Sequence, residues 1–101
     1  MMINNMRPIH PGQILREEFL IPLGMSAHAL AMAIHVPGPR INDIVREKRS
    51  LSPDTVLRLS RYFGTTPEFW MNLQSAFDLR TARIEKMADI EREVRPRDMA
   101  A

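Results

Sequence analysis

The chain has 101 residues, of which 45% are hydrophobic and 26% are charged, and its formal net charge is +2. This length supports one small domain with a single core, and the composition excludes an intrinsically disordered chain. The absence of cysteine excludes disulfides and thiolate metal sites. A net charge of +2 gives only weak support for nucleic-acid binding, so the positions of the basic residues matter more than their number.

No segment of the sequence has the pattern of a membrane anchor or a secretory signal. The apolar runs fall short of the roughly 20 residues that span a bilayer, and residues 1–13 lack the apolar core of a signal peptide. Together with the missing cysteines, these features favour a cytoplasmic protein without a membrane partner.

The N-terminal segment, residues 1–10, shows no hydrophobic periodicity and is predicted to be a flexible arm. A first helix is expected from Pro11, because proline suits a first turn and apolar residues then recur at helical spacing. Pro22 and Gly24 are expected to stop this helix, so residues 21–25 are predicted to form a connection.

The next two predicted helices are short and lie close together in sequence. The first spans residues 27–34, with Ser26 as its N-cap. After a turn at residues 35–36, the second spans about residues 37–46, because the two prolines at its start fit only in a first turn. Two short helices joined by a tight turn outline a helix-turn-helix, whose second helix enters the major groove of DNA.

The second of these helices has one apolar face and one polar face. Advancing 100° per residue places Ile41, Ile44 and Val45 together, so this side is expected to face the core. The opposite side is predicted to meet base edges, where arginine recognises guanine, asparagine recognises adenine and aspartate accepts from cytosine. For Asp43, an ion pair that orients a neighbouring arginine is at least as good an interpretation. The residues on this polar side are Pro39, Arg40, Asn42, Asp43 and Arg46.

Arg46, Lys48 and Arg49 form a basic cluster at the end of this helix. Such residues can merely complement the helix dipole. Next to a helix that reads DNA, phosphate contact is the preferred interpretation, because most protein–DNA hydrogen bonds go to the backbone. The complete predicted DNA-binding set is Ser26, Pro39, Arg40, Asn42, Asp43, Arg46, Lys48 and Arg49.

Two more helices are predicted downstream from repeated cap-then-proline signals. Ser52 and Pro53 open the first, in which Leu57 is expected to widen the apolar stripe and which Gly64 ends. Thr66 opens the second, which carries an aromatic stripe. We interpret this stripe as core rather than as a ligand box or a stacking platform for single-stranded nucleic acid. Its members are Phe69, Trp70, Leu73 and Phe77, with Trp70 as the expected anchor.

After residue 78 the sequence becomes highly charged and keeps only a thin apolar stripe, formed by Ile84, Met87, Ile90 and Val94. Such a stripe buries little surface alone, so it is predicted to contact a partner: the body of the domain, a second copy, or a different protein. The predicted organisation is an arm at 1–10, a helix-turn-helix domain at 11–80, and a helical extension with a disordered tail at 81–101.

The sequence shows no pattern typical of a catalytic or metal-binding site. The three histidines lie in an arm, a helix and a turn, with no carboxylate at metal-ligand spacing. The chain also lacks a nucleophile–base pairing, a phosphate-binding loop and a dinucleotide-binding turn. We therefore expect neither an enzyme nor a cofactor.

The strings HPGQILREEF and PEFWMNLQ, within a similarity covering roughly residues 9–83, closely resemble the HigA family of antitoxins. The resemblance implies an all-α, compact bundle of about five helices with a lambda-repressor-like helix-turn-helix and a C-terminal helical extension. It implies a homodimer that binds double-stranded operator DNA, represses its own operon and neutralises a HigB-type mRNA endonuclease. A solitary regulator without a toxin, or an interaction module that has lost DNA binding, are the alternatives.

Matched to the family pattern, Ala31, Ile41 and Ile44 occupy buried positions of the motif. Two residues depart from the wider pattern. His35 stands in the turn where glycine is usual, and histidine is among the residues that tolerate a left-handed backbone. Glu47 replaces a glycine after the recognition helix, and its charge puts the geometry of the following loop in question.

Overall fold

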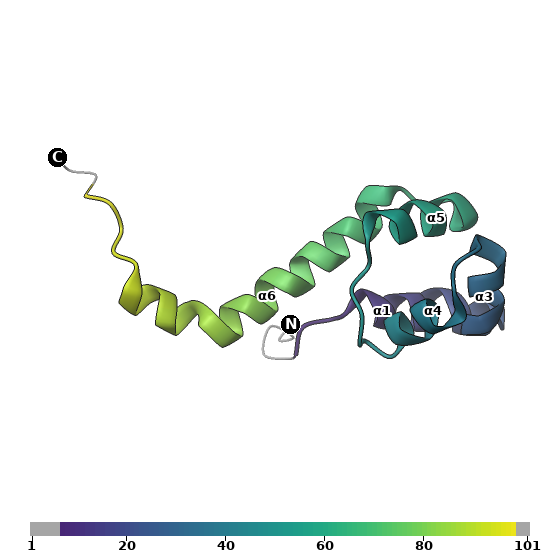
Figure 1. Cartoon of the computed structure of the whole chain (residues 1–101), viewed down its shortest axis with the longest axis horizontal. Coiled ribbons are helices and arrows are strands. Elements are labelled where there is room, and N and C mark those ends of the chain that lie inside the picture. The colour runs from purple at the N-terminus through teal and green to yellow at the C-terminus, as the bar shows by residue number, and fades with distance from the viewer. Residues whose placement is uncertain (1–6, 99–101) are drawn as a thin grey trace.

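The computed structural model describes residues 7–98, and in this range it contains helices and no strand. Three segments follow one another without a break and act as one helix, so the fold comprises five helices, as predicted (Figure 1). The segments are α1 (Pro11–Ile14), η2 (Leu15–Leu20), α2 (Ile21–Leu23), α3 (Ala27–Ile34), α4 (Gly38–Val45), α5 (Pro53–Phe63) and α6 (Pro67–Glu93).

The first helix continues past the point where the sequence predicts its end. Residues 15–20 form a π-helix, in which the Ile21 N–H donates to the Arg16 carbonyl five residues earlier. A π-turn is wider than an α-turn, and this relieves the clash between a proline ring and the carbonyl of the preceding turn. Pro22 is therefore accommodated within α2, and the prediction of a connection at 21–23 is wrong. The helix ends at Gly24, whose φ of 62° is left-handed.

Side-chain caps fix the starts of α3, α5 and α6 where the sequence predicts them. The Ser26 hydroxyl accepts from the Ala29 N–H at 3.0 Å, and the Thr66 hydroxyl accepts from the Phe69 N–H at 3.1 Å. Ser52 caps α5 in the same way. Each cap satisfies a backbone donor that the first turn leaves unpaired.

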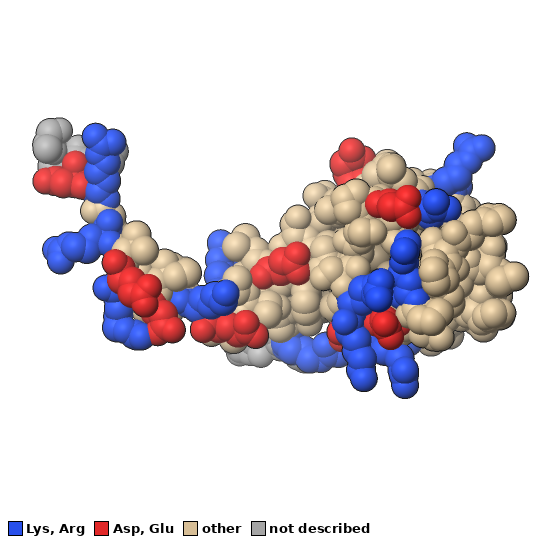
Figure 2. Space-filling model, in the orientation of Figure 1, with Lys and Arg blue, Asp and Glu red and all other residues tan. Residues whose placement is uncertain are grey.

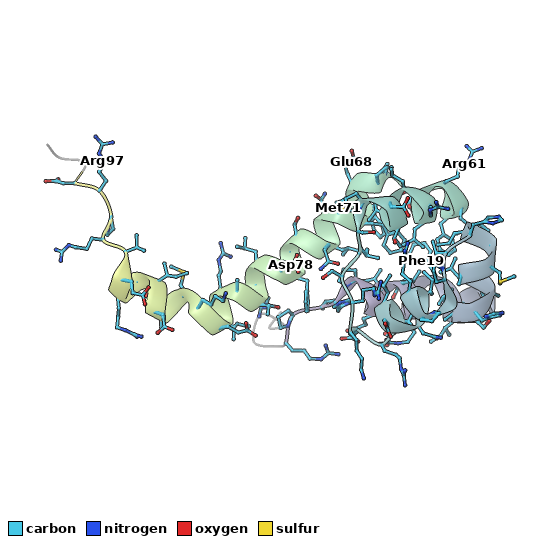
Figure 3. The ribbon with its side chains drawn as sticks, viewed as in Figure 1. Phe19, Arg61, Glu68, Met71, Asp78 and Arg97 are labelled. Atoms are coloured by element: carbon cyan, nitrogen blue, oxygen red, sulfur yellow. The ribbon has the colours of Figure 1, made fainter. Side chains whose placement is uncertain are left out.

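The core draws fully buried side chains from all five helices. Trp70 is its largest member at 0% exposed, and its indole N–H donates to the Thr65 hydroxyl at 2.7 Å. Its ring lies 5.1 Å from that of Phe19, which points into the body of the domain (Figure 3). The prediction of Trp70 as core anchor is confirmed. Two other expectations are wrong, because Leu57 is 59% exposed and Phe69 is 38% exposed.

Helix α6 begins in the body of the domain and then extends away from it (Figure 1). It runs uninterrupted through residues 80–81, so the predicted domain and its helical extension share one helix. Ile84, Met87 and Ile90 of the thin stripe lie on the protruding part, and Val94 follows as its C-cap. Their exposed fractions run from 38% for Met87 to 65% for Ile84. Within residues 7–98, no helix is both long enough and apolar enough to cross a membrane.

Candidate nucleic-acid interface

Helix α4 presents a polar face to solvent because its apolar face is anchored in the core. Ile41 and Ile44 are fully buried, as predicted. Of the predicted DNA-binding residues on α4 and at its end, some are exposed and two are half-buried. The exposed ones are Pro39, Asn42 and Arg46; the half-buried ones are Arg40 and Asp43.

The remaining predicted contacts flank this face. Ser26 is exposed at the start of α3, and Lys48 and Arg49 are exposed in the loop that follows α4. Figure 2 shows Lys and Arg side chains gathered on the surface around this loop, with acidic side chains among them. These basic side chains are therefore concentrated on one part of the surface, so a basic patch is compatible with a net charge of only +2.

Two arginines of this surface, Arg40 and Arg49, are held by ion pairs that the helical spacing did not identify. Asp43 pairs with Arg49 at 3.8 Å, and Arg40 pairs with Asp54 of α5 at 3.6 Å. The predicted partner of Asp43, a neighbouring arginine on the same helix, is thus corrected. The loop turns back at Lys48, whose N–H donates to the Asp43 carbonyl at 2.8 Å, and this brings Arg49 to Asp43. Exposed pairs of this kind are weak and can exchange for phosphate.

A polar groove of about 420 Å³ lies between α4, its following loop and the start of α5. Two arginines and two serines contribute hydrogen-bond donors to its walls. The acidic member, Asp54, is engaged by Arg40 at 3.6 Å and by Arg58 at 2.9 Å. Such a groove suits a phosphate group. The lining residues are Arg40, Arg49, Ser50, Ser52, Asp54 and Thr55.

Both helices of the motif end in Schellman turns that place a non-glycine residue in the left-handed region. After α3, His35 has a φ of 59°, and the Val36 N–H donates to the Ala31 carbonyl at 3.0 Å. After α4, Glu47 has a φ of 64° and takes the equivalent position. The tolerance predicted for His35 is confirmed, and Glu47 adopts the left-handed geometry that glycine, the residue of the wider family pattern at this position, takes readily.

The Glu47 carboxylate is neutralised by two arginines from the N-terminal part of the chain. Arg7 donates to it at 3.1 Å and Arg16 at 3.3 Å. Burial alone would raise the pKa of Glu47, but the hydrogen bonds from Arg16 and Arg7 outweigh this effect and lower the pKa below its usual value. The ionised Glu47 carboxylate therefore links the end of α4 to Arg16 of the first helix and to Arg7, which precedes that helix.

The start of the first helix packs backbone against backbone on the end of α4. A Cβ atom built on Gly12 would lie 1.7 Å from the Ile44 carbonyl oxygen, so only glycine fits. His10 holds this approach, because its Nδ1 accepts from the Gly12 N–H at 2.8 Å and its ring packs edge-on against Phe77. Residues 1–6 of the predicted arm lie outside the described range, while His10 is buried in the body.

The His10 ring is kept neutral by its surroundings. Burial lowers the pKa of His10, and the negative charges of Glu47 and Asp78 offset part of this effect. The neutral ring is the form whose Nδ1 can accept the Gly12 N–H. Within residues 7–98, His10 and its neighbours included, His, Asp and Glu side chains form no group of three that could hold a metal ion.

Comparison with known proteins identifies the family to which this architecture belongs. A helix-turn-helix family model matches residues 15–70, more than half of the chain. Virulence-associated protein I of Dichelobacter nodosus is 56% identical over 85 residues, which cover 84% of this chain and 79% of that protein.

Solved structures give the same result. The Pseudomonas aeruginosa antitoxin HigA, solved with the higBA promoter, is 53% identical and has a TM-score of 0.88, covering 90% of this chain and 99% of that one. The antitoxin GraA in complex with its operator is 55% identical, with a TM-score of 0.85 and coverage of 90% and 92%. The chain therefore belongs to the HigA family of antitoxins, with a helix-turn-helix of the XRE type.

Proposed function

We propose that this protein binds the operator of its own operon as a dimer and thereby represses transcription. One observation carries the proposal: α4 is anchored by two fully buried isoleucines and presents Pro39, Asn42 and Arg46 to solvent beside a local basic surface. The HigA and GraA relatives, solved with a promoter and with an operator, support it.

The side chains of this surface divide into two roles. Arg40 and Asn42 are proposed to read bases, since guanidinium and amide groups match the major-groove edges of guanine and adenine. Arg46, Lys48 and Arg49 are proposed to contact phosphates and so fix the register of α4. Ser26 lies at the start of α3, where a helix N-terminus favours a phosphate. Pro39 is exposed and Asp43 is half-buried on the same face, and Asp43 is proposed to orient Arg49 through its ion pair.

Operator binding is tested by the substitution Arg40→Ala. We expect a loss of roughly 1 to 3 kcal/mol in binding free energy for each contact to the duplex upstream of the gene, with reduced discrimination at the same base position of each half-site. Fluorescence anisotropy titration at several salt concentrations measures both. Wild-type affinity should fall steeply as salt rises, because phosphate contacts release counterions.

The matched control is Arg61→Ala, which removes the same charge from α5 at a point well away from α4 (Figure 3). Its operator affinity should equal that of the wild type. Equal affinity and selectivity in the Arg40→Ala variant would remove Arg40 from the contact surface. A wild-type protein with no preference for its own operator over unrelated duplex DNA would overturn the proposal of a repressor.

We also propose that the protein neutralises a HigB-type mRNA endonuclease, as membership of an antitoxin family suggests. Co-expression with the product of the neighbouring gene, followed by affinity purification, tests this directly. A stable complex that abolishes mRNA cleavage in a translation assay is the expected result. Operator binding without capture of such a product would instead make this chain a solitary regulator.

The exposed stripe on α6 is proposed to form the dimer interface. Replacing Ile90 by aspartate places a charge in the centre of the stripe, and burial of an unpaired charge is strongly unfavourable. We expect Ile90→Asp to convert the dimer to a monomer in size-exclusion chromatography with light scattering. The control Arg92→Asp, on the opposite face of the same helix, should remain dimeric. An Ile90→Asp variant that stays dimeric would move the interface elsewhere.

A further inference from the structure

The loop that carries Lys48 and Arg49 is fixed at both ends. At its start, the Lys48 N–H donates to the Asp43 carbonyl and closes the Schellman turn of α4. At its end, the Leu51 N–H donates to the Gln74 Oε1 of α6 at 2.7 Å, and the Leu51 side chain is buried. The segment between these two anchors forms part of the wall of the polar groove.

Gln74 is suited to hold this loop because its amide orientation is determined. Its Nε2 donates to the Asp78 carboxylate at 2.9 Å, one turn further along α6 (Figure 3 shows Asp78). The carbonyl oxygen of the amide therefore has to face the Leu51 N–H. Gln74 is 4% exposed, and a buried amide whose oxygen and nitrogen are both hydrogen-bonded has little freedom to move.

We propose that Gln74 is a positioning residue for operator binding: it holds the loop in the shape that aims Lys48 and Arg49 at the DNA backbone. The inference rests on the proposed function and adds a residue that touches no DNA itself. It also assigns a role to α6 besides carrying the exposed stripe, because the helix sets the geometry of the phosphate-contacting surface.

The test separates positioning from simple stabilisation through the salt dependence of operator binding. Each phosphate contact adds about 0.9 to the slope of log affinity against log salt concentration. Gln74→Leu removes the acceptor of the Leu51 N–H in both copies of the proposed dimer, so we expect lower affinity and a slope reduced by about two to four. In a Lys48→Ala/Arg49→Ala background, the same substitution should leave both the affinity and the slope unchanged.

Exchanging the chemical groups of Gln74 and Asp78 tests whether a restored acceptor for the Leu51 N–H rescues operator binding. The double variant Gln74→Glu/Asp78→Asn exchanges the donor and acceptor between the two side chains and keeps the total charge, so the Leu51 N–H retains its acceptor. This variant should recover the wild-type slope. The control Leu59→Val perturbs an equally buried core position and should leave the slope unchanged. An unaltered slope in Gln74→Leu, or an undiminished effect without Lys48 and Arg49, would overturn the proposal.

Amide hydrogen exchange gives a measurement that does not depend on DNA. In the free protein, Gln74→Leu should accelerate exchange at the Leu51 amide relative to the amides of the α5 core. Equal protection at Leu51 in the variant and the wild type would show that Gln74 does not hold the loop. Failure of the wild type to bind operator would instead count against the proposed function, while this measurement would still report on Gln74.

Discussion

Gly12→Ala should be among the most damaging single substitutions in this chain, because the new methyl group would lie 1.7 Å from the Ile44 carbonyl oxygen. Both partners are backbone, so neither can yield by a side-chain rotation. Overpacking typically costs about 1 to 3 kcal/mol, and we expect the upper end or more. The first helix would have to separate from α4, so operator affinity should fall together with stability.

Urea unfolding followed by circular dichroism measures the loss in stability, and operator titration measures the functional part. Gly64→Ala is the matched control, since it adds the same methyl group at a position with no atom within 4 Å. Its φ of 77° is left-handed, so it should cost only about 1 kcal/mol and leave operator affinity unchanged. A Gly12→Ala protein as stable as the wild type would show that the first helix and α4 can move apart without a loss of stability.

Trp70→Ala should cost about 3 to 5 kcal/mol, as expected for a large aromatic side chain deleted from a core. Trp70 contacts the rings of Phe19 and Phe69 and satisfies its indole N–H at Thr65. Small domains are stable by roughly 5 to 15 kcal/mol, so this loss removes a large part of the stability, and the variant should unfold at a much lower urea concentration. Trp70 is the single tryptophan of the chain, and circular dichroism therefore has to replace fluorescence as the probe.

Phe69→Ala deletes an aromatic ring from the adjacent position and serves as the control. Because Phe69 is 38% exposed, its loss should cost clearly less than the loss of Trp70. The contrary result would be a Trp70→Ala protein that folds normally but no longer binds operator or toxin. That result would place Trp70 at a contact surface and not in the core.

The helix caps and the buried face of α4 could be predicted from the sequence, because each depends on residues that lie close together in the chain. Ser26, Ser52 and Thr66 cap helices where their spacing predicts, and the apolar residues of α4 are buried on the predicted face. The end of the first helix was missed, because a π-turn that accommodates Pro22 has no signature in a periodicity of 3.6 residues.

The contacts that shape the candidate site join residues far apart in sequence, and periodicity does not identify such partners. Gln74 meets the loop at Leu51, 23 residues earlier, and Arg16 meets Glu47, 31 residues later. Gly12 carries a weak signal, since a glycine inside a helix implies a close approach, but the sequence does not say to what. The exposed face of α4 was predictable, whereas the supports that orient it were not.

Because α6 is one uninterrupted helix, the residues along it face fixed directions relative to one another. Each residue of an α-helix advances the chain by about 1.5 Å and rotates it by about 100°. The direction of the stripe relative to α4 is therefore set by the number of residues between Gln74 and Ile84. One residue inserted there would turn the stripe by about 100° and, in the proposed dimer, would point the second copy in another direction. In the proposed dimer, the number of residues in α6, as much as the chemistry of α4, would set which spacing of two half-sites the pair of copies can span.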